Sequence, residues 1–112
     1  MIGRPKDSLN HKESNCLNLE MTCLQGADLT DTYFEGAFLI DSNLEGANLS
    51  NAHLEGADLM YVHLERADLK AAHLEGADLN MANLEIANLE WAKLEGANLK
   101  NANFKKAYLI GC

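Results

Sequence analysis

The sequence predicts an all-β solenoid, a four-sided coil in which twenty residues complete each turn. Two periodicities carry this prediction. Leucine or phenylalanine recurs at every fifth residue from Leu24 to Leu109, and Glu-Gly pairs follow the apolar residue at intervals that are multiples of ten. Such self-similarity outweighs local secondary-structure patterns, because a repeated unit determines the whole fold.

The five-residue period predicts a core ladder. Of its eighteen positions, sixteen are leucine and two are phenylalanine, and the residue two places earlier is alanine in fourteen units and threonine, serine or valine in the others. The ladder consists of Leu24, Leu29, Phe34, Leu39, Leu44, Leu49, Leu54, Leu59, Leu64, Leu69, Leu74, Leu79, Leu84, Leu89, Leu94, Leu99, Phe104 and Leu109. On an α-helix these side chains would be rotated by about 140° from one to the next, and on a flat strand they would alternate between faces. All of them can be buried only if the chain bends once per unit, with Ala and Leu inward and the Asp or Asn between them outward.

The Glu-Gly pairs indicate how many corners close one turn. They occur at 35–36, 45–46, 55–56, 75–76 and 95–96. A turn of twenty residues stacks Gly36, Gly56, Gly76 and Gly96 in one column, whereas a turn of fifteen would place Glu35 against Ser50. Four sides are therefore favoured. Glycine at the third position of a type II turn takes a positive φ without penalty, which explains why it is the second corner residue.

With these eighteen units, residues 22–111 resemble the pentapeptide repeat family. The resemblance implies a right-handed quadrilateral parallel β-helix, here of about 4.5 coils, with a short N-terminal cap that is helical in many relatives. We therefore expect a cap segment at 1–18, for which the resemblance offers a short helix as one option, and the β-helix at 19–112. The departures from the usual pattern are Tyr61, Val62, Arg66, Ile86 and Trp91.

The charge distribution excludes a direct nucleic-acid binder. The net charge is −8, and the stretch from Glu13 to Glu95 holds 16 acidic and three basic residues. The remaining Lys and Arg residues lie near the two ends. A phosphate binder needs a basic stripe, and the middle of this chain has the opposite character.

Membrane insertion and secretion are not expected. No apolar run approaches the roughly 18 residues of a membrane span, and the first 20 residues lack the apolar stretch of a signal peptide. A cytoplasmic location is therefore expected. Cys16, Cys23 and Cys112 are too scattered for a disulfide framework or a zinc site. Some relatives bracket the N-terminal segment with a disulfide, but in a reducing cytoplasm Cys16 and Cys23 are expected to be free thiols.

Stacking at twenty residues predicts surface columns, including two acidic ones at opposite corners. The candidate interaction surface comprises Glu35, Glu55, Glu75 and Glu95, then Glu45, Glu65 and Glu85, and the apolar corner residues Tyr61, Met81 and Trp91. Another column contains Tyr33, His53, His73 and Lys93. Two imidazoles one layer apart could share a metal, but the column holds no carboxylate, so no metal site and no cofactor are expected.

The predicted function is non-enzymatic, with no catalytic residue, because every polar group projects from a convex prism. The solenoid is expected to present its acidic surface to a protein partner and to form a homodimer through the C-terminal coil. An alternative follows from the resemblance, which implies that relatives acting on type II topoisomerases mimic DNA. From Leu24 to Glu95 the net charge is −11. With one layer per about 4.8 Å along the axis, the charge per unit length of the solenoid is close to that of duplex DNA. The short length of the rod argues against this alternative.

Overall fold

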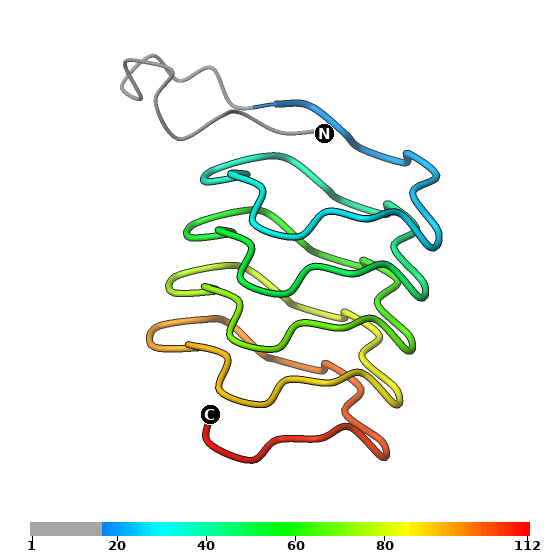
Figure 1. Cartoon of the computed structure of the whole chain (residues 1–112). Helices are drawn as coiled ribbons and strands as arrows, with labels where there is room; N and C mark the ends of the chain where they lie inside the picture. The colour runs from blue at the N-terminus through cyan, green and yellow to red at the C-terminus, as the bar shows by residue number, and fades with distance from the viewer. Residues whose placement is uncertain (1–16) are drawn as a thin grey trace.

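The computed structural model describes residues 17–112, which wind as a stack of coils about one axis (Figure 1). Each five-residue unit contributes one residue in a parallel β-bridge and then a two-residue turn. Within 17–112 there is no helix, and no strand is longer than a single bridging residue. The expected cap at 1–18 lies almost wholly outside the described residues, as does Cys16.

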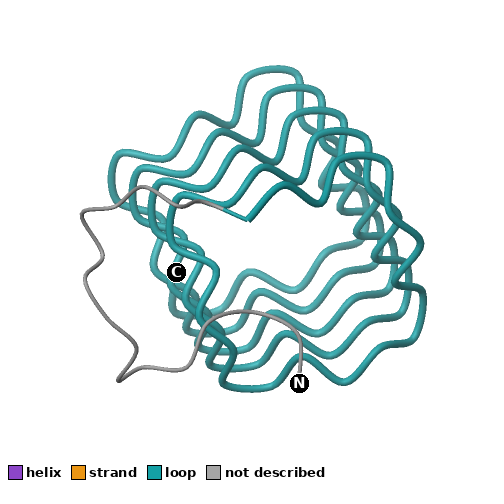
Figure 2. Cartoon of the chain, turned by 90° about the horizontal axis from the view of Figure 1, so that it is seen from above, coloured by secondary structure: helices purple, strands orange, loops and turns teal. Residues whose placement is uncertain are grey.

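The register between coils confirms the four-sided turn. All fifteen parallel bridges join residues twenty apart, from Asn18 with Phe38 to Asn88 with Tyr108. Viewed along the axis, the coils superpose in a four-sided outline (Figure 2). Because Asn18 is already paired, the solenoid begins one unit before Leu24, with Leu17 and Leu19 in the inward positions. The 96 described residues therefore make slightly less than five turns.

The backbone hydrogen bonds repeat in every unit of the interior. Leu64 N donates to Asn83 O at 2.8 Å and Arg66 N donates to Glu85 O at 3.0 Å, both in the next coil. His63 N donates to Ser42 O of the previous coil, and Ala67 N donates to Leu64 O across the corner. Four of the five N–H groups of the unit are thus satisfied by backbone carbonyls, as a buried ladder requires.

The fifth N–H group explains why Asp and Asn recur before the leucine. Asp68 Oδ1 accepts a hydrogen bond from Lys70 N at 3.0 Å, and Asn88 Oδ1 accepts one from Glu90 N at the same distance. The side chain at this outward position thus caps the corner that follows it, which is the local hydrogen bonding for which Asx residues are favoured in turns. The sequence predicted the outward direction of these residues but not this role.

Every corner from Met21 to Gly111 has its second residue in the left-handed region, with φ between 58° and 80°. The positive φ at the third turn residue and the hydrogen bond across the corner are the features of the expected type II turn. Only seven of these nineteen residues are glycine. Asn and Asp tolerate this conformation, but Ile86, with a φ of 64°, is a β-branched residue for which it is strained.

The interior consists of leucine and alanine from successive layers. The ladder is fully buried from Leu29 to Leu89, with each side chain at most 1% exposed, and Val62 fits among the alanines. Thr32 and Ser42 are also buried, and their hydroxyls donate to Leu29 O and Leu39 O. At the ends of the described stack the ladder is less covered: Leu24, Leu94, Leu99 and Phe104 are partly buried, and Leu109 is 45% exposed.

Candidate interaction surface

The outward positions form columns because equivalent residues of successive coils are paired twenty apart. The histidine column is Tyr33, His53, His73 and Lys93. The first acidic column, at the corner beside it, is Glu35, Glu55, Glu75 and Glu95. The second acidic column, at the diagonally opposite corner, is Glu45, Glu65 and Glu85. The register thus brings each set together as the periodicity predicted.

The aromatic rings of the histidine column stack directly on one another. The ring centroids of Tyr33 and His53 are 4.5 Å apart with an interplanar angle of 9°, and those of His53 and His73 are 4.4 Å apart with an angle of 6°. Stacking at the layer spacing follows from the paired backbone, since neighbouring strands are separated by about 4.8 Å. Tyr33, His53 and His73 therefore form a continuous stack of rings rather than a row of independent side chains.

Carboxylates of the first acidic column reach these imidazoles. His53 Nδ1 lies 3.1 Å from Glu55 Oε2, and His73 Nδ1 lies 3.9 Å from the same oxygen and 3.5 Å from Glu75 Oε2. The histidine column itself holds no carboxylate, as the sequence indicated, but the first acidic column supplies one to each imidazole, which an interpretation of single columns misses. A signal was present in the repeated His-Leu-Glu triplets at 53–55 and 73–75, which place both polar side chains outward.

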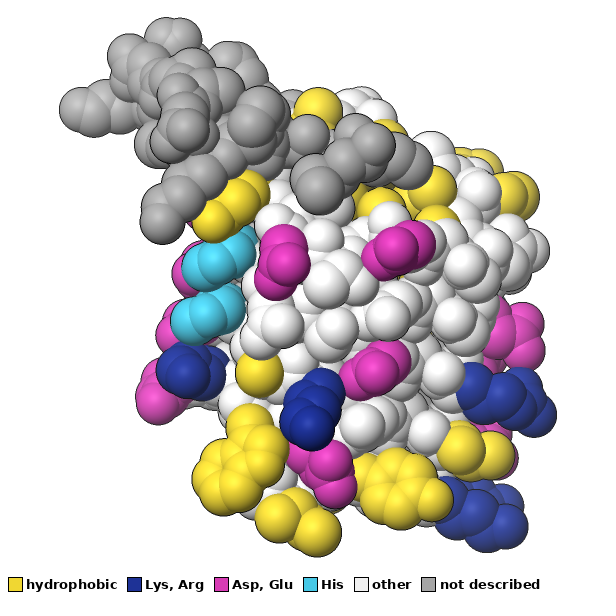
Figure 3. Space-filling view, in the orientation of Figure 1, with side chains coloured by type: hydrophobic (Ala, Val, Ile, Leu, Met, Phe, Trp, Pro, Cys, Tyr) yellow, Lys and Arg dark blue, Asp and Glu magenta, His cyan; other side chains and the backbone are white. Residues whose placement is uncertain are grey.

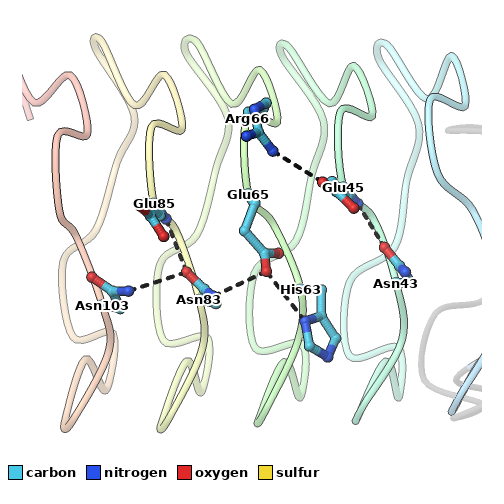
Figure 4. Close-up of polar contacts among 8 residues, drawn as sticks. All are labelled: Asn43, Glu45, His63, Glu65, Arg66, Asn83, Glu85 and Asn103. Atoms are coloured by element: carbon cyan, nitrogen blue, oxygen red, sulfur yellow. Dashed lines mark hydrogen bonds and ion pairs between the residues drawn. The ribbon is translucent and has the colours of Figure 1, made fainter.

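The second acidic column has a different set of partners (Figure 4). Glu65 Oε2 accepts a hydrogen bond from Asn83 Nδ2 at 2.9 Å and lies 3.4 Å from His63 Nδ1. Arg66 donates to Glu45 Oε2 at 3.0 Å. Glu65 is the least exposed of these side chains at 22%, whereas Arg66 and Glu45 are exposed at 62% and 47%. The Arg66–Glu45 pair is therefore a solvent-screened contact that contributes little stability.

These contacts change the character of the acidic surface. Several glutamates of the two acidic columns accept from, or lie close to, a neighbouring His, Asn or Arg, among them Glu45, Glu55, Glu65 and Glu75. The columns therefore present carboxylates that are held in place by neighbouring side chains, rather than freely moving charges.

On another face, two hydrogen bonds lower the pKa of Asp28, the stronger from the Thr30 hydroxyl and the weaker from the Thr30 backbone N–H.

Apolar side chains are also exposed on the prism. Tyr61, Met81 and Trp91 are 48%, 44% and 59% exposed, as their predicted corner positions imply. Tyr108 and Ile110, for which the sequence predicted no role, are 56% and 64% exposed in the last coil. Hydrophobic side chains gather at this C-terminal end, next to basic ones (Figure 3).

Two shallow grooves lie at the C-terminal end of the stack. One is lined by Trp91, Lys93, Glu95 and Gly111 among others, and the second by Leu94, Leu99, Phe104, Leu109 and Cys112.

Cys23 and Cys112 are free and exposed. Among the residues that the structure describes, no helix has the length and apolar character needed to cross a bilayer.

Comparison with known proteins decides the family. A family model of the pentapeptide repeat region matches residues 27–104. The chain belongs to the pentapeptide repeat family. No curated protein matches the chain. The fold is accordingly the right-handed quadrilateral β-helix of that family, as the sequence predicted.

Solved structures of pentapeptide repeat proteins are similar to this one. HetL of the cyanobacterium Nostoc sp. strain PCC 7120, a protein involved in heterocyst differentiation regulation, is 38% identical with a TM-score of 0.79, over 81% of this chain and 44% of HetL. Rfr23 of the cyanobacterium Cyanothece 51142 is 33% identical with a TM-score of 0.65, over 82% of this chain and 59% of Rfr23. A pentapeptide repeat protein from the thylakoid lumen of Arabidopsis thaliana is 32% identical with a TM-score of 0.54, over 94% of this chain and 68% of the Arabidopsis chain. This pentapeptide repeat chain spans about half the length of the first two relatives.

Proposed function

We propose that this pentapeptide repeat chain is a non-enzymatic module whose acidic columns bind a basic surface of a protein partner. The observation that carries the proposal is the arrangement of the two acidic columns at opposite corners of a hydrogen-bonded scaffold. A scaffold that does not reorganise on binding loses little conformational entropy, and charge complementarity then directs the choice of partner. The likeness to HetL, a protein involved in regulation, supports a role in protein recognition.

The test is affinity capture of partners from an extract of the native host with charge-matched variants. In one variant Glu45, Glu65 and Glu85 become Gln; in the control, Asp58, Asp68 and Asp78 become Asn. Both remove three charges, but only the first removes them from an acidic column. We expect the first to lose the partner and the control to keep it, and capture to weaken with salt. Equal loss in both variants would contradict recognition by the column.

The proposal includes a second copy of the chain as a partner of the C-terminal coil. Tyr108, Leu109 and Ile110 are 45–64% exposed there, and such apolar surface favours association. The charges of Lys100, Lys105 and Lys106 at the same end oppose it. We expect light scattering at micromolar concentration to give twice the mass of one chain. A mass that stays at one chain as the concentration rises would reject this part of the proposal.

A second candidate function is imitation of DNA toward a type II topoisomerase, favoured by the net charge of −11 between Leu24 and Glu95. Supercoiling by DNA gyrase separates the candidates. The partner-binding proposal expects no change at protein concentrations far above that of the enzyme, and inhibition that scales with protein would favour the mimic.

The proposal places the chain in the cytoplasm, the location expected from the sequence. The relative from the thylakoid lumen shows that the family also occurs elsewhere. Fractionation of host cells with an antibody to the chain tests this part, and recovery in a lumenal fraction would overturn it.

A further inference from the structure

We propose that His53, His73 and Glu55 bind one divalent late transition-metal ion of the Zn²⁺ or Cu²⁺ class. Glu55 Oε2 lies 3.1 Å from His53 Nδ1 and 3.9 Å from His73 Nδ1. The three ligand atoms all lie within 4.8 Å of one another. Two imidazole nitrogens and a carboxylate oxygen are the ligands that these ions take in proteins, with the remaining positions filled by water.

The carboxylates around this cluster have unused acceptors. Glu55 Oε1 and Glu75 Oε1 are buried atoms without a hydrogen-bond partner, although a buried acceptor is costly to leave unpaired. A cation held by the two Nδ1 atoms would lie close to both carboxylates. Lys93 is the next residue of the column after His73 and opposes a cation, but the flanking Glu55 and Glu75 outweigh its single charge.

The backbone holds the two imidazoles one layer apart. His53 and His73 are a bridge pair, and their N–H groups donate to Thr32 O and Ala52 O at 2.8 Å. The side chains of His53, His73 and Glu55 are 27%, 28% and 35% exposed, so an ion can reach them from solvent. The site therefore needs no change of the fold in order to load.

Side-chain rotation is needed, because the two rings are nearly parallel at 6°. A tetrahedral ion with bonds of about 2.0–2.1 Å holds two nitrogens about 3.3 Å apart. Each ring must therefore turn about its Cβ–Cγ bond until the Nδ1 lone pairs converge. This torsion is broad for histidine, so the movement is inexpensive.

His63 provides a matched control within the same chain. It belongs to the same His-Leu-Glu triplet, and its Nδ1 lies 3.4 Å from Glu65 Oε2. The bridge partners of His63 are Asn43 and Asn83, so this cluster has one imidazole instead of two. A general affinity of exposed imidazoles or carboxylates for metal would act on both clusters, whereas the proposed site requires the histidine pair.

The experiment is calorimetric titration with ZnCl₂ in a buffer that does not bind metal. All proteins carry Cys16→Ser, Cys23→Ser, Cys112→Ser and His11→Asn, which removes the thiols and the N-terminal imidazole as competing ligands and leaves His63 as the control. We expect one ion per chain, and weakening of roughly tenfold or more in each of His53→Asn, His73→Asn and Glu55→Gln. His63→Asn should bind within about twofold of the parent. Asn already occupies the equivalent outward position at Asn43 and Asn83, so these variants are expected to fold, which circular dichroism checks.

Two further readouts make the result decisive. Zn²⁺ should raise the melting temperature of the parent and of His63→Asn equally and that of His73→Asn by clearly less, because a ligand that binds only the folded state stabilises it by an amount that rises with the affinity of the ligand. Imidazole NMR signals of His53 and His73 should shift with Zn²⁺ while those of His63 stay. Absence of saturable binding, equal affinity in His73→Asn, or equal shifts at His63 would each overturn the proposal.

Discussion

Trp91 lies against Gly111 of the next coil, where a Cβ atom on the glycine would stand 2.7 Å from Trp91 Cδ2. The two residues occupy the same corner twenty positions apart, and both have a positive φ. A ring held in this way is a local probe of the C-terminal coil, since Trp91 is the single tryptophan of the chain.

Gly111→Ala is expected to displace the Trp91 ring and to shift its fluorescence emission toward that of a fully hydrated indole. The new methyl group cannot share the space of the ring, and a real Cβ contact does not fall below 3.0 Å. Gly46→Ala is the control, because it introduces the same backbone strain at a φ of 69° with nothing within 4 Å. An equal spectral change in both variants would mean that backbone strain, and not the contact, moves the ring.

Ile86→Gly is expected to stabilise the protein by about 1 kcal/mol, measured by urea denaturation. The left-handed conformation costs an L-residue roughly 1–2 kcal/mol, and glycine removes that cost while losing the contacts of a half-buried side chain. Asn51→Gly, at a φ of 60°, should change stability by only a few tenths of a kcal/mol, because Asn tolerates this region. A destabilised Ile86→Gly protein would show that packing outweighs strain at this corner.

Leu64→Ala and Leu69→Ala are each expected to cost about 2–5 kcal/mol, since both side chains are fully buried between layers. Glu65→Ala is not a neutral comparison for these variants. Glu65 has partners in Asn83 and His63, so the exposed Lys70 is the better one. Thermal melts of Lys70→Ala should match the parent, and losses comparable to those of the leucine variants would refute the assignment of inside and outside.

Asp68→Ala is expected to cost about 1 kcal/mol, because the N–H of Lys70 loses the carboxylate oxygen that accepts its hydrogen bond. Asp68→Asn keeps an acceptor at that position and should retain the stability of the parent. Urea denaturation of the two variants separates the loss of the cap from the loss of charge. If Asp68→Asn destabilises the protein as much as Asp68→Ala does, the loss of stability comes from the missing charge and not from the missing hydrogen bond.

Thr30→Ala is expected to raise the pKa of Asp28 toward its ordinary value, because the Thr30 hydroxyl donates to Asp28 Oδ1 at 2.8 Å. A carboxyl with a lowered folded-state pKa stabilises the protein above its unfolded-state pKa, and this contribution is lost as the pH falls through the folded-state pKa. NMR titration of Asp28 measures the shift. Thr30→Ser keeps the hydroxyl and should leave the pKa of Asp28 low. If the pKa of Asp28 stays low in Thr30→Ala, the backbone N–H of residue 30 alone is responsible for lowering it.

Coil length, the core and the columns could all be predicted from the sequence. A strict repeat makes each layer equivalent to the next, so one register places every leucine inside and stacks His53 on His73. This works because each unit contacts only its neighbours, and local patterning then determines the long-range contacts.

Only the tertiary structure decided how side chains of adjacent columns meet. Whether Glu55 turns toward His53 and His73, or whether Arg66 reaches Glu45, depends on side-chain torsions and on distances between coils. The left-handed backbone at Ile86 is likewise imposed by its neighbours, because the hydrogen-bonded ladder above and below forces each corner to turn alike whatever residue stands there. The repeat thus determined the positions of the side chains, while their contacts followed from packing in three dimensions.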